Sequence, residues 1–152
     1  EMSVIQQILQ DLADHLQEAD SYFDEEFYFD TSQATASLNF PCFCYQVIQT
    51  NEDYASGSLN PDCREYVKLV QLSCLTDTTN PDTLIKELWD FEEKLITTLR
   101  GVIPQDINPN LMELNFTRSS ALDSLWSIPD NENDSEFLCN ELFAVYELKY
   151  VI

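Results

Sequence analysis

The sequence predicts an α+β fold: a mostly antiparallel sheet in the order α-β-β-α-β-β, with the helices packed on one face. Two observations predict it. Amphipathic helical patterns cover residues 3–23 and 80–101, and most of the remaining chain alternates apolar and polar residues as strands do. The chain has 152 residues, the size of one domain. We therefore expect residues 1–152 to form a single domain, with residues 21–37 as an acidic-aromatic extension or loop.

The first predicted helix begins at a capping box formed by Ser3 and Gln6 and continues to Phe23. His15, the single histidine, falls outside its apolar stripe, so we expect this side chain to face solvent. The stripe recurs at three- and four-residue steps and consists of Val4, Ile5, Ile8, Leu9, Leu12, Leu16, Ala19 and Phe23.

The segment 21–37 mixes acidic and aromatic side chains. Exposed aromatic side chains favour association, so a run of them among acids needs an explanation. Two interpretations remain open: the segment folds back on the core, or it binds a neighbouring molecule.

Two strands are predicted at residues 38–50 and 65–75, joined by a long loop, as an antiparallel hairpin. Cys42 and Cys44 alternate along the first strand and so share one of its faces. We expect both to be small core residues of a cytosolic protein.

The best-marked helix is predicted at residues 80–101. Asn80 can cap it, Pro81 suits its first turn, and Gly101 can end it. A wide apolar stripe is expected to be buried. It consists of Leu84, Leu88, Phe91, Leu95 and Leu99, widened by Ile85, Trp89 and Ile96.

The last third of the chain is expected to be β-structure. Residues 111–116 and 122–128 are predicted to form one strand interrupted by a bulge. A polar turn at residues 129–136 and a long final strand at residues 137–152 complete the sheet.

The charge balance excludes whole classes of function. The chain has 28 acidic and 7 basic residues, a formal net charge of −21. This balance argues against nucleic-acid binding, which needs cations to displace counterions from phosphates, and against anionic membranes. No apolar stretch approaches the roughly 20 residues that span a bilayer. The acidic surface is then simply solvated, repels DNA, or imitates it.

No pattern in the sequence predicts an enzyme. Two glycines are too few for a phosphate-binding loop, His15 has no neighbouring nucleophile in the sequence, and Cys42 and Cys44 have the wrong spacing for zinc. An incomplete calcium-loop pattern has Ser135 where the sharp turn needs glycine; its acids are Asp130, Glu132, Asp134 and Glu141. We therefore expect no catalytic residue, no cofactor and no metal.

The order of elements resembles that of the tail terminator (tail completion) proteins of tailed bacteriophages. The helix at residues 80–99 between two hairpins and the closing segment Glu141–Ile152 carry most of the likeness. The resemblance implies a structural virion protein, commonly a hexameric ring, that caps the tail tube and connects it to the neck. It is made in the host cytoplasm and then lies at the head–tail joint.

The implied partners are other copies of the chain, a tail tube or sheath protein and a neck or connector protein. DNA would pass through an acidic conduit without specific binding, and no membrane is involved. The residues expected at subunit or partner interfaces are Tyr22, Phe23, Phe27, Tyr28, Phe29, Tyr54 and Trp126. The residues expected to form the acidic DNA-repelling surface are Asp20, Asp24, Glu25, Glu26 and Asp30.

Two alternatives remain beside the terminator. One is another head–tail connector or neck protein with a similar order of elements. The other is an acidic DNA mimic that inhibits a DNA-binding enzyme by presenting carboxylates in place of phosphates. The acidic run from Asp11 to Asp30 motivates the second alternative.

Overall fold

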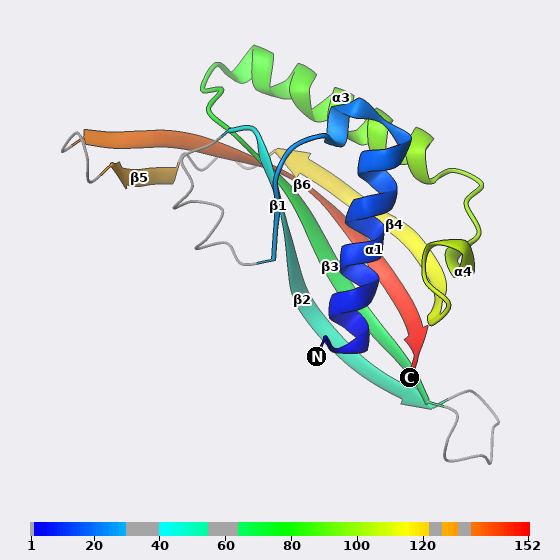
Figure 1. Cartoon of the computed structure of the whole chain (residues 1–152). Coiled ribbons are helices and arrows are strands. Elements are labelled where there is room, and N and C mark those ends of the chain that lie inside the picture. The colour runs from blue at the N-terminus through cyan, green and yellow to red at the C-terminus, as the bar shows by residue number, and fades with distance from the viewer. Residues whose placement is uncertain (1, 30–39, 55–63, 122–125, 131–134) are drawn as a thin grey trace.

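The computed structural model describes residues 2–29, 40–54, 64–121, 126–130 and 135–152 (Figure 1). The fold is α+β, as the sequence predicts. In chain order, the elements are α1 (Val4–Ala19), the 3₁₀ turn η1 (Ser21–Phe23), β1 (Phe27–Tyr28), β2 (Cys42–Tyr54), β3 (Arg64–Thr76), α3 (Pro81–Leu99), α4 (Pro104–Ile107), β4 (Leu111–Ala121), β5 (Trp126–Asp130) and β6 (Ser135–Val151).

The sheet is mixed, with the strand order β1-β2-β3-β6-β4, and β5 pairs with β6 off this path. The predicted strand order therefore needs correction. β1 is a short extra strand that runs parallel to β2, with Phe27 opposite Phe43, whereas the other pairings are antiparallel. The amide of Phe43 donates to the carbonyl of Glu26 at 2.9 Å, so the chain after η1 returns along β2 and adds to its edge.

α1 begins as predicted, because Ser3 and Gln6 form the capping box, but it ends earlier. The amide of Gln6 donates to Ser3 Oγ at 3.3 Å, and the amide of Ser3 donates to Gln6 Oε1 at 2.9 Å. At the other end, Asp20 accepts a hydrogen bond from the amide of Tyr22 at 2.9 Å and starts η1. This cap separates Phe23 from the helix that we predicted to include it.

α3 is capped at Asn80, whose Oδ1 accepts from the amides of Asp82 and Thr83 at 3.0 and 3.2 Å. Gly101 follows the helix with φ 72°, the left-handed conformation that glycine adopts readily. The buried side chains of α3 are Leu84, Phe91 and Leu95. The predicted width of the buried stripe is wrong: Ile85, Trp89 and Ile96 are 44%, 61% and 39% exposed.

One large core unites both long helices with alternate residues of the sheet. From α1 it includes Ile8, Leu12 and Leu16, and from α3 it includes Phe91 and Leu95. The strand residues in this core are Phe43, Tyr45, Val70, Leu72, Cys74, Leu111, Leu142, Ala144, Tyr146, Leu148 and Tyr150. Figure 1 shows α1 lying across the sheet, as this core requires.

A smaller cluster on the opposite set of strand residues contains Cys42, Cys44 and Leu75. Tyr28 and Phe40 pack against it. The expectation that Cys42 and Cys44 are buried on one strand face is confirmed, since they are 0% and 2% exposed.

β4 and β5 are two strands, so the prediction of one interrupted strand is wrong. Residues 117–120, the expected interruption, lie inside β4, where a register shift between Phe116 and Arg118 absorbs the irregularity. β5 pairs instead with the first five residues of β6, from Asp130 opposite Ser135 to Trp126 opposite Cys139. We call β5 and residues 135–139 the arm; Figure 1 shows it leaving the body of the sheet.

Candidate interaction surface

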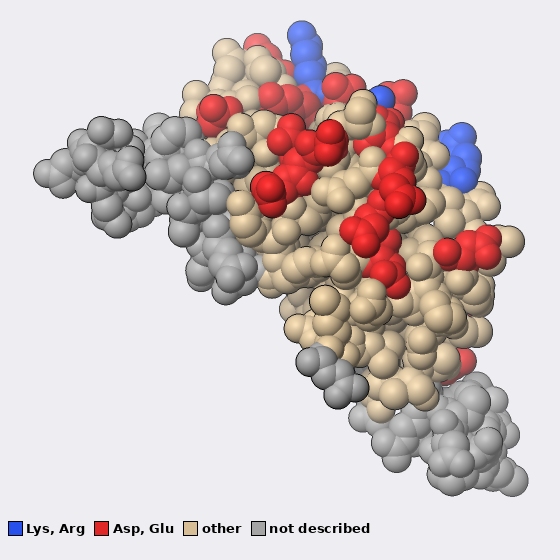
Figure 2. Space-filling view, in the orientation of Figure 1, with Lys and Arg blue, Asp and Glu red and all other residues tan. Residues whose placement is uncertain are grey.

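Carboxylates gather on the face of the molecule on which α1 and α3 lie. Figure 2 shows them spread over this face, with the visible Lys and Arg side chains at its margin. The exposed acidic residues of α1, α3 and the segment between η1 and β1 are Asp14, Glu18, Asp24, Glu25, Glu26, Asp82, Asp90 and Glu93. We call this surface the acidic face.

Among the residues predicted for a DNA-repelling surface, Asp20 has a structural role. Its carboxylate accepts from the amide of Tyr22 and contacts Lys94 Nζ at 3.3 Å. The backbone hydrogen bond from Tyr22, with a smaller contribution from Lys94, lowers the pKa of Asp20. Asp24, Glu25 and Glu26 are exposed, and Asp30 lies outside the described residues.

The aromatic side chains after α1 mostly fold back on the core. Phe23 is fully buried, so it is a core residue and is not available to a neighbouring subunit. The ring of Phe27 stacks on that of Phe43 at 4.8 Å between centroids, and Tyr22 and Phe27 pack against the large core. Tyr28 packs against the smaller cluster. For residues 21–29, the first of the two interpretations therefore applies.

Phe29 differs from the other aromatic side chains of this segment, because it is 44% exposed. Its ring stacks on Tyr45 at 5.9 Å and forms part of an open groove between α1 and β2, of about 650 Å³. Val47 and Ile48, each 43% exposed, also line this groove. Tyr54 and Trp126 lie in β2 and β5, but their side chains are outside the described part of the chain.

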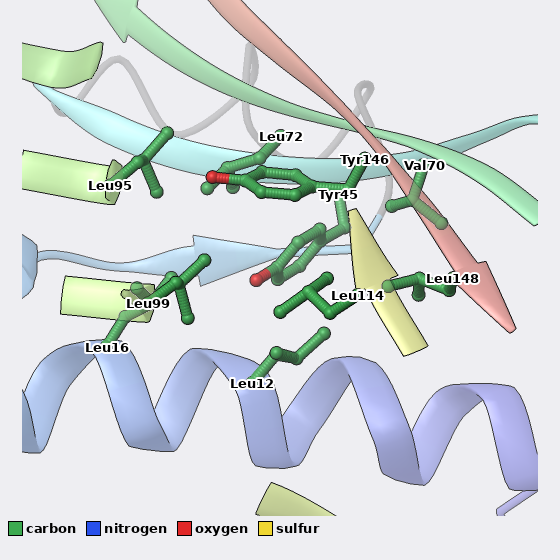
Figure 3. A pocket seen from close by; sticks show the side chains of 10 residues that line it. All are labelled: Leu12, Leu16, Tyr45, Val70, Leu72, Leu95, Leu99, Leu114, Tyr146 and Leu148. Carbon is green, nitrogen blue, oxygen red and sulfur yellow. The ribbon is translucent and has the colours of Figure 1, made fainter. Parts of the chain in front are cut away.

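The interior offers no room for a substrate at the cavity drawn in Figure 3. This cavity has a volume of about 10 Å³, far below the roughly 300 Å³ of a small-molecule site. Leucines line most of it, and Figure 3 shows the rings of Tyr45 and Tyr146 side by side, with their hydroxyls toward the leucines of the helices. Burial raises the pKa of both phenols, and the Tyr146 hydroxyl has no hydrogen-bond partner.

Glu141 is a buried carboxylate that the sequence pattern does not single out as such. It is 3% exposed and accepts from Ser73 Oγ at 2.5 Å and from Gln71 Nε2 at 2.6 Å. Burial raises its pKa, and the two hydrogen bonds partly oppose that rise. The side chain of Glu141 therefore links β6 to β3 by hydrogen bonds within the sheet. Of the other calcium-like positions, Asp130 lies in β5, while Glu132 and Asp134 are outside the described residues.

The described residues contain no cluster of three or more side chains that could hold a metal ion. Cys42, Cys44 and Cys74 are buried thiols that do not form disulfides. Burial is the main cause of the raised pKa of the Cys74 thiol, which is therefore held in its unreactive protonated form.

The prediction that His15 faces solvent is wrong. Its Nε2 atom is buried and has no hydrogen-bond partner. The reason lies in α4, which covers this flank of α1: Asn108 at its end donates to Asp11 Oδ2 at 2.8 Å, one turn before His15.

Comparison with known proteins finds no family model and no curated protein that matches the sequence. Within the described ranges, no helix is both long and apolar enough to cross a membrane.

Proposed function

We propose that the protein is a structural virion subunit that assembles head to tail into a ring, as a tail terminator at the head–tail joint. The observation that carries this proposal is the arm. Residues 135–139 of β6 leave the main sheet and pair only with β5 among the described strands. A two-stranded hairpin is at best marginally stable alone in water, so a projecting one gains stability by lying on a neighbour.

The edge of β2 offers a surface that could receive such a neighbour. β1 pairs with β2 only at Phe43 and Cys44, so beyond them the outer edge of β2 has no partner among the described strands. The groove between α1 and β2 lies beside that edge. An arm and a receiving edge are different surfaces, so their pairing is heterologous and can close a ring.

The acidic face suits the wall of a DNA conduit in such a ring. With the helices on one face of the sheet, their exposed carboxylates form several negative patches on that face (Figure 2). A negative wall repels phosphates and does not trap a passing duplex. Asp24, Glu25 and Glu26 belong to this wall in our proposal, whereas Asp20 helps to hold η1.

The acidic face equally supports an alternative, an inhibitor that imitates DNA. The two functions differ in self-association, because an inhibitor of this kind can act as a monomer. Another head–tail connector or neck protein would also form a ring, and its position on the particle would distinguish it.

The test is sedimentation velocity at increasing protein concentration, in low and in high sodium chloride. High salt shortens the Debye length to about 3 Å at 1 M, so repulsion between chains of charge −21 no longer opposes assembly. We expect one closed oligomer larger than a dimer. A monomer under all conditions would contradict the ring and direct the work to competition with DNA for basic enzymes.

A variant without the arm tests the observation itself. Ala121 pairs with Leu142, and in this register position 123 is the counterpart of Asn140, so replacing residues 124–139 by Asn-Gly joins β4 to β6 through a two-residue turn. We expect a folded monomer. Ile48→Lys in the groove should also weaken assembly, whereas Met2→Lys, at another exposed apolar residue, should not. An oligomer that survives both the arm deletion and Ile48→Lys would exclude this mode of assembly.

A further inference from the structure

α3 carries a second apolar surface that no part of the core requires. Ile85, Trp89 and Ile96 are spaced four and seven residues apart, so they lie on one flank of the helix. The rise of about 1.5 Å per residue makes this stripe about 16 Å long, or three turns. Trp89 is 61% exposed, more than Ile85 or Ile96. We call these three residues the α3 stripe.

The stripe continues into a groove between the C-terminal half of α3 and β4. The groove has a volume of about 240 Å³, and Ile96 belongs to both surfaces. Leu114 and Phe116 of β4 line its other wall, and Phe116 is 41% exposed. Stripe and groove thus form one elongated apolar surface along α3, with the shape that accepts the apolar face of another helix.

Tyr146 lies at the base of this surface. The residue lines the groove and is 6% exposed, and its hydroxyl makes no hydrogen bond. Buried hydroxyls are usually paired, because leaving one unpaired costs free energy. Because this hydroxyl is itself buried and lies in the cavity of Figure 3, Tyr146 offers the groove no polar group, and the docking surface is apolar at this point.

The charges around this surface determine what kind of helix fits. On α3 the stripe is flanked by three carboxylates, those of Asp82, Glu92 and Glu93, and by the cations Lys86 and Arg100, of which Arg100 lines the groove. A second copy of the chain would bring a further formal charge of −21 to this surface. Lysines or arginines beside the apolar face of an incoming helix would instead be attracted.

We propose that the α3 stripe and its groove form a docking site for a basic amphipathic helix of a different protein. Ile85, Trp89 and Ile96 pack against the apolar face of that helix, and Trp89 is the main anchor, as exposed tryptophans at interfaces often are. The site is separate from the arm and from the edge of β2, so it does not depend on the proposed ring.

The test measures binding of a fluorescently labelled synthetic peptide of leucine and lysine, patterned as an amphipathic helix, by fluorescence anisotropy with the full chain. We expect saturable binding that Ile85→Ala with Trp89→Ala weakens at least about tenfold. Trp89→Gln alone should weaken it in the same direction. A peptide of identical composition, with its leucines scrambled around the helix, should also bind at least about tenfold less tightly.

The matched control is Met2→Ala with Ile152→Ala, which removes two exposed apolar side chains that line neither groove and should leave peptide binding unchanged. Circular dichroism establishes that each variant is folded. Three results would overturn the proposal: no binding to the wild type, equal binding of the scrambled peptide, or equal binding by the Ile85/Trp89 variant. Loss of self-association in that variant would assign the stripe to a second copy and equally overturn it.

Discussion

Glu141 links the stability of the sheet to pH. Its carboxyl group is buried among neutral partners, and burial raises its pKa above the ordinary value of 4.5. At a pH between 4.5 and the raised pKa, Glu141 keeps a proton in the folded state that it has released in the unfolded state. The contribution of Glu141 to the free energy of unfolding therefore decreases as pH rises through this window, and is constant above and below it.

Glu141→Gln tests this linkage. The amide oxygen can still accept from Ser73 Oγ and Gln71 Nε2, but the side chain no longer titrates. We expect the stability difference, variant minus wild type, to grow as pH rises above 4.5 and then to level off. Urea unfolding of both proteins across this pH range measures it, and the difference cancels the contributions of acids common to both. A difference that does not vary with pH would show that Glu141 titrates normally.

Glu141→Ala is the informative comparison. It leaves the donors of Ser73 and Gln71 without their acceptor in a buried position, which costs roughly 1–3 kcal/mol. At neutral pH, Glu141→Gln should therefore be at least as stable as the wild type, whereas Glu141→Ala should be less stable.

Single-residue environments were the part of the candidate site that the sequence predicted least well. Glu141 looks like any acid in a long strand, and its burial follows from β6 lying in the middle of the sheet. His15 is polar and off the apolar stripe, yet α4, more than 80 residues later in the chain, covers its flank of α1. Neither contact has a local signal in the sequence.

Helices were predicted better where their ends carry chemical signals. Asn80, Pro81 and Gly101 located α3 to within about two residues, because caps are local interactions. The width of the buried face of α3 could not be predicted in this way, because it depends on contacts with distant parts of the chain. Ile85, Trp89 and Ile96 continue the apolar stripe in the sequence, but only the flank of α3 that meets the sheet is covered.

Two neighbouring residues of α3 test this assignment. Leu95 is fully buried, so Leu95→Ala opens a cavity and should cost roughly 2–5 kcal/mol of unfolding free energy. Ile96 is 39% exposed, and Ile96→Ala should cost about 1 kcal/mol or less. Urea unfolding of both variants gives the comparison. Equal losses would mean that something else covers the Ile96 flank, such as a second copy of the chain.

At the scale of the whole molecule, alternation along the strands predicted the α+β class but not the topology. β6 was the last strand expected, yet it lies between β3 and β4. Its core residues recur at every second position, which identifies the strand face toward the helices but not the place of the strand in the sheet. β1 was not predicted, because two residues are too few for a periodic pattern. The contacts of residues 21–29 also lack a local signal in the sequence, because their aromatic side chains pack against residues of β2 that come near only in the folded chain.

Net charge acts on the molecule as a whole, so its effect on stability should appear in the salt response. A formal charge of −21 on 152 residues makes the compact state repel itself. The ion pairs described, Lys94–Asp20 and those of Lys149 with Glu65 and Glu113, are partly exposed, and such surface pairs add little stability. Repulsion should therefore dominate. Raising sodium chloride from about 0.01 to about 0.15 M shortens the Debye length from about 30 to about 8 Å.

We expect that step to stabilise the fold by about 1 kcal/mol, a rise of roughly 2–4 °C in melting temperature by circular dichroism. Sodium chloride is used because sulfate also strengthens the burial of apolar groups, an effect that is separate from charge screening. The control variant is Asp24→Asn with Glu25→Gln and Glu26→Gln, whose three exposed positions lie on the acidic face. It lowers the negative charge by three units and should show a smaller response. A melting temperature that falls with salt would contradict this prediction and would mean that the few ion pairs outweigh the repulsion. The carboxylates of the acidic face would then contribute to the stability of the fold.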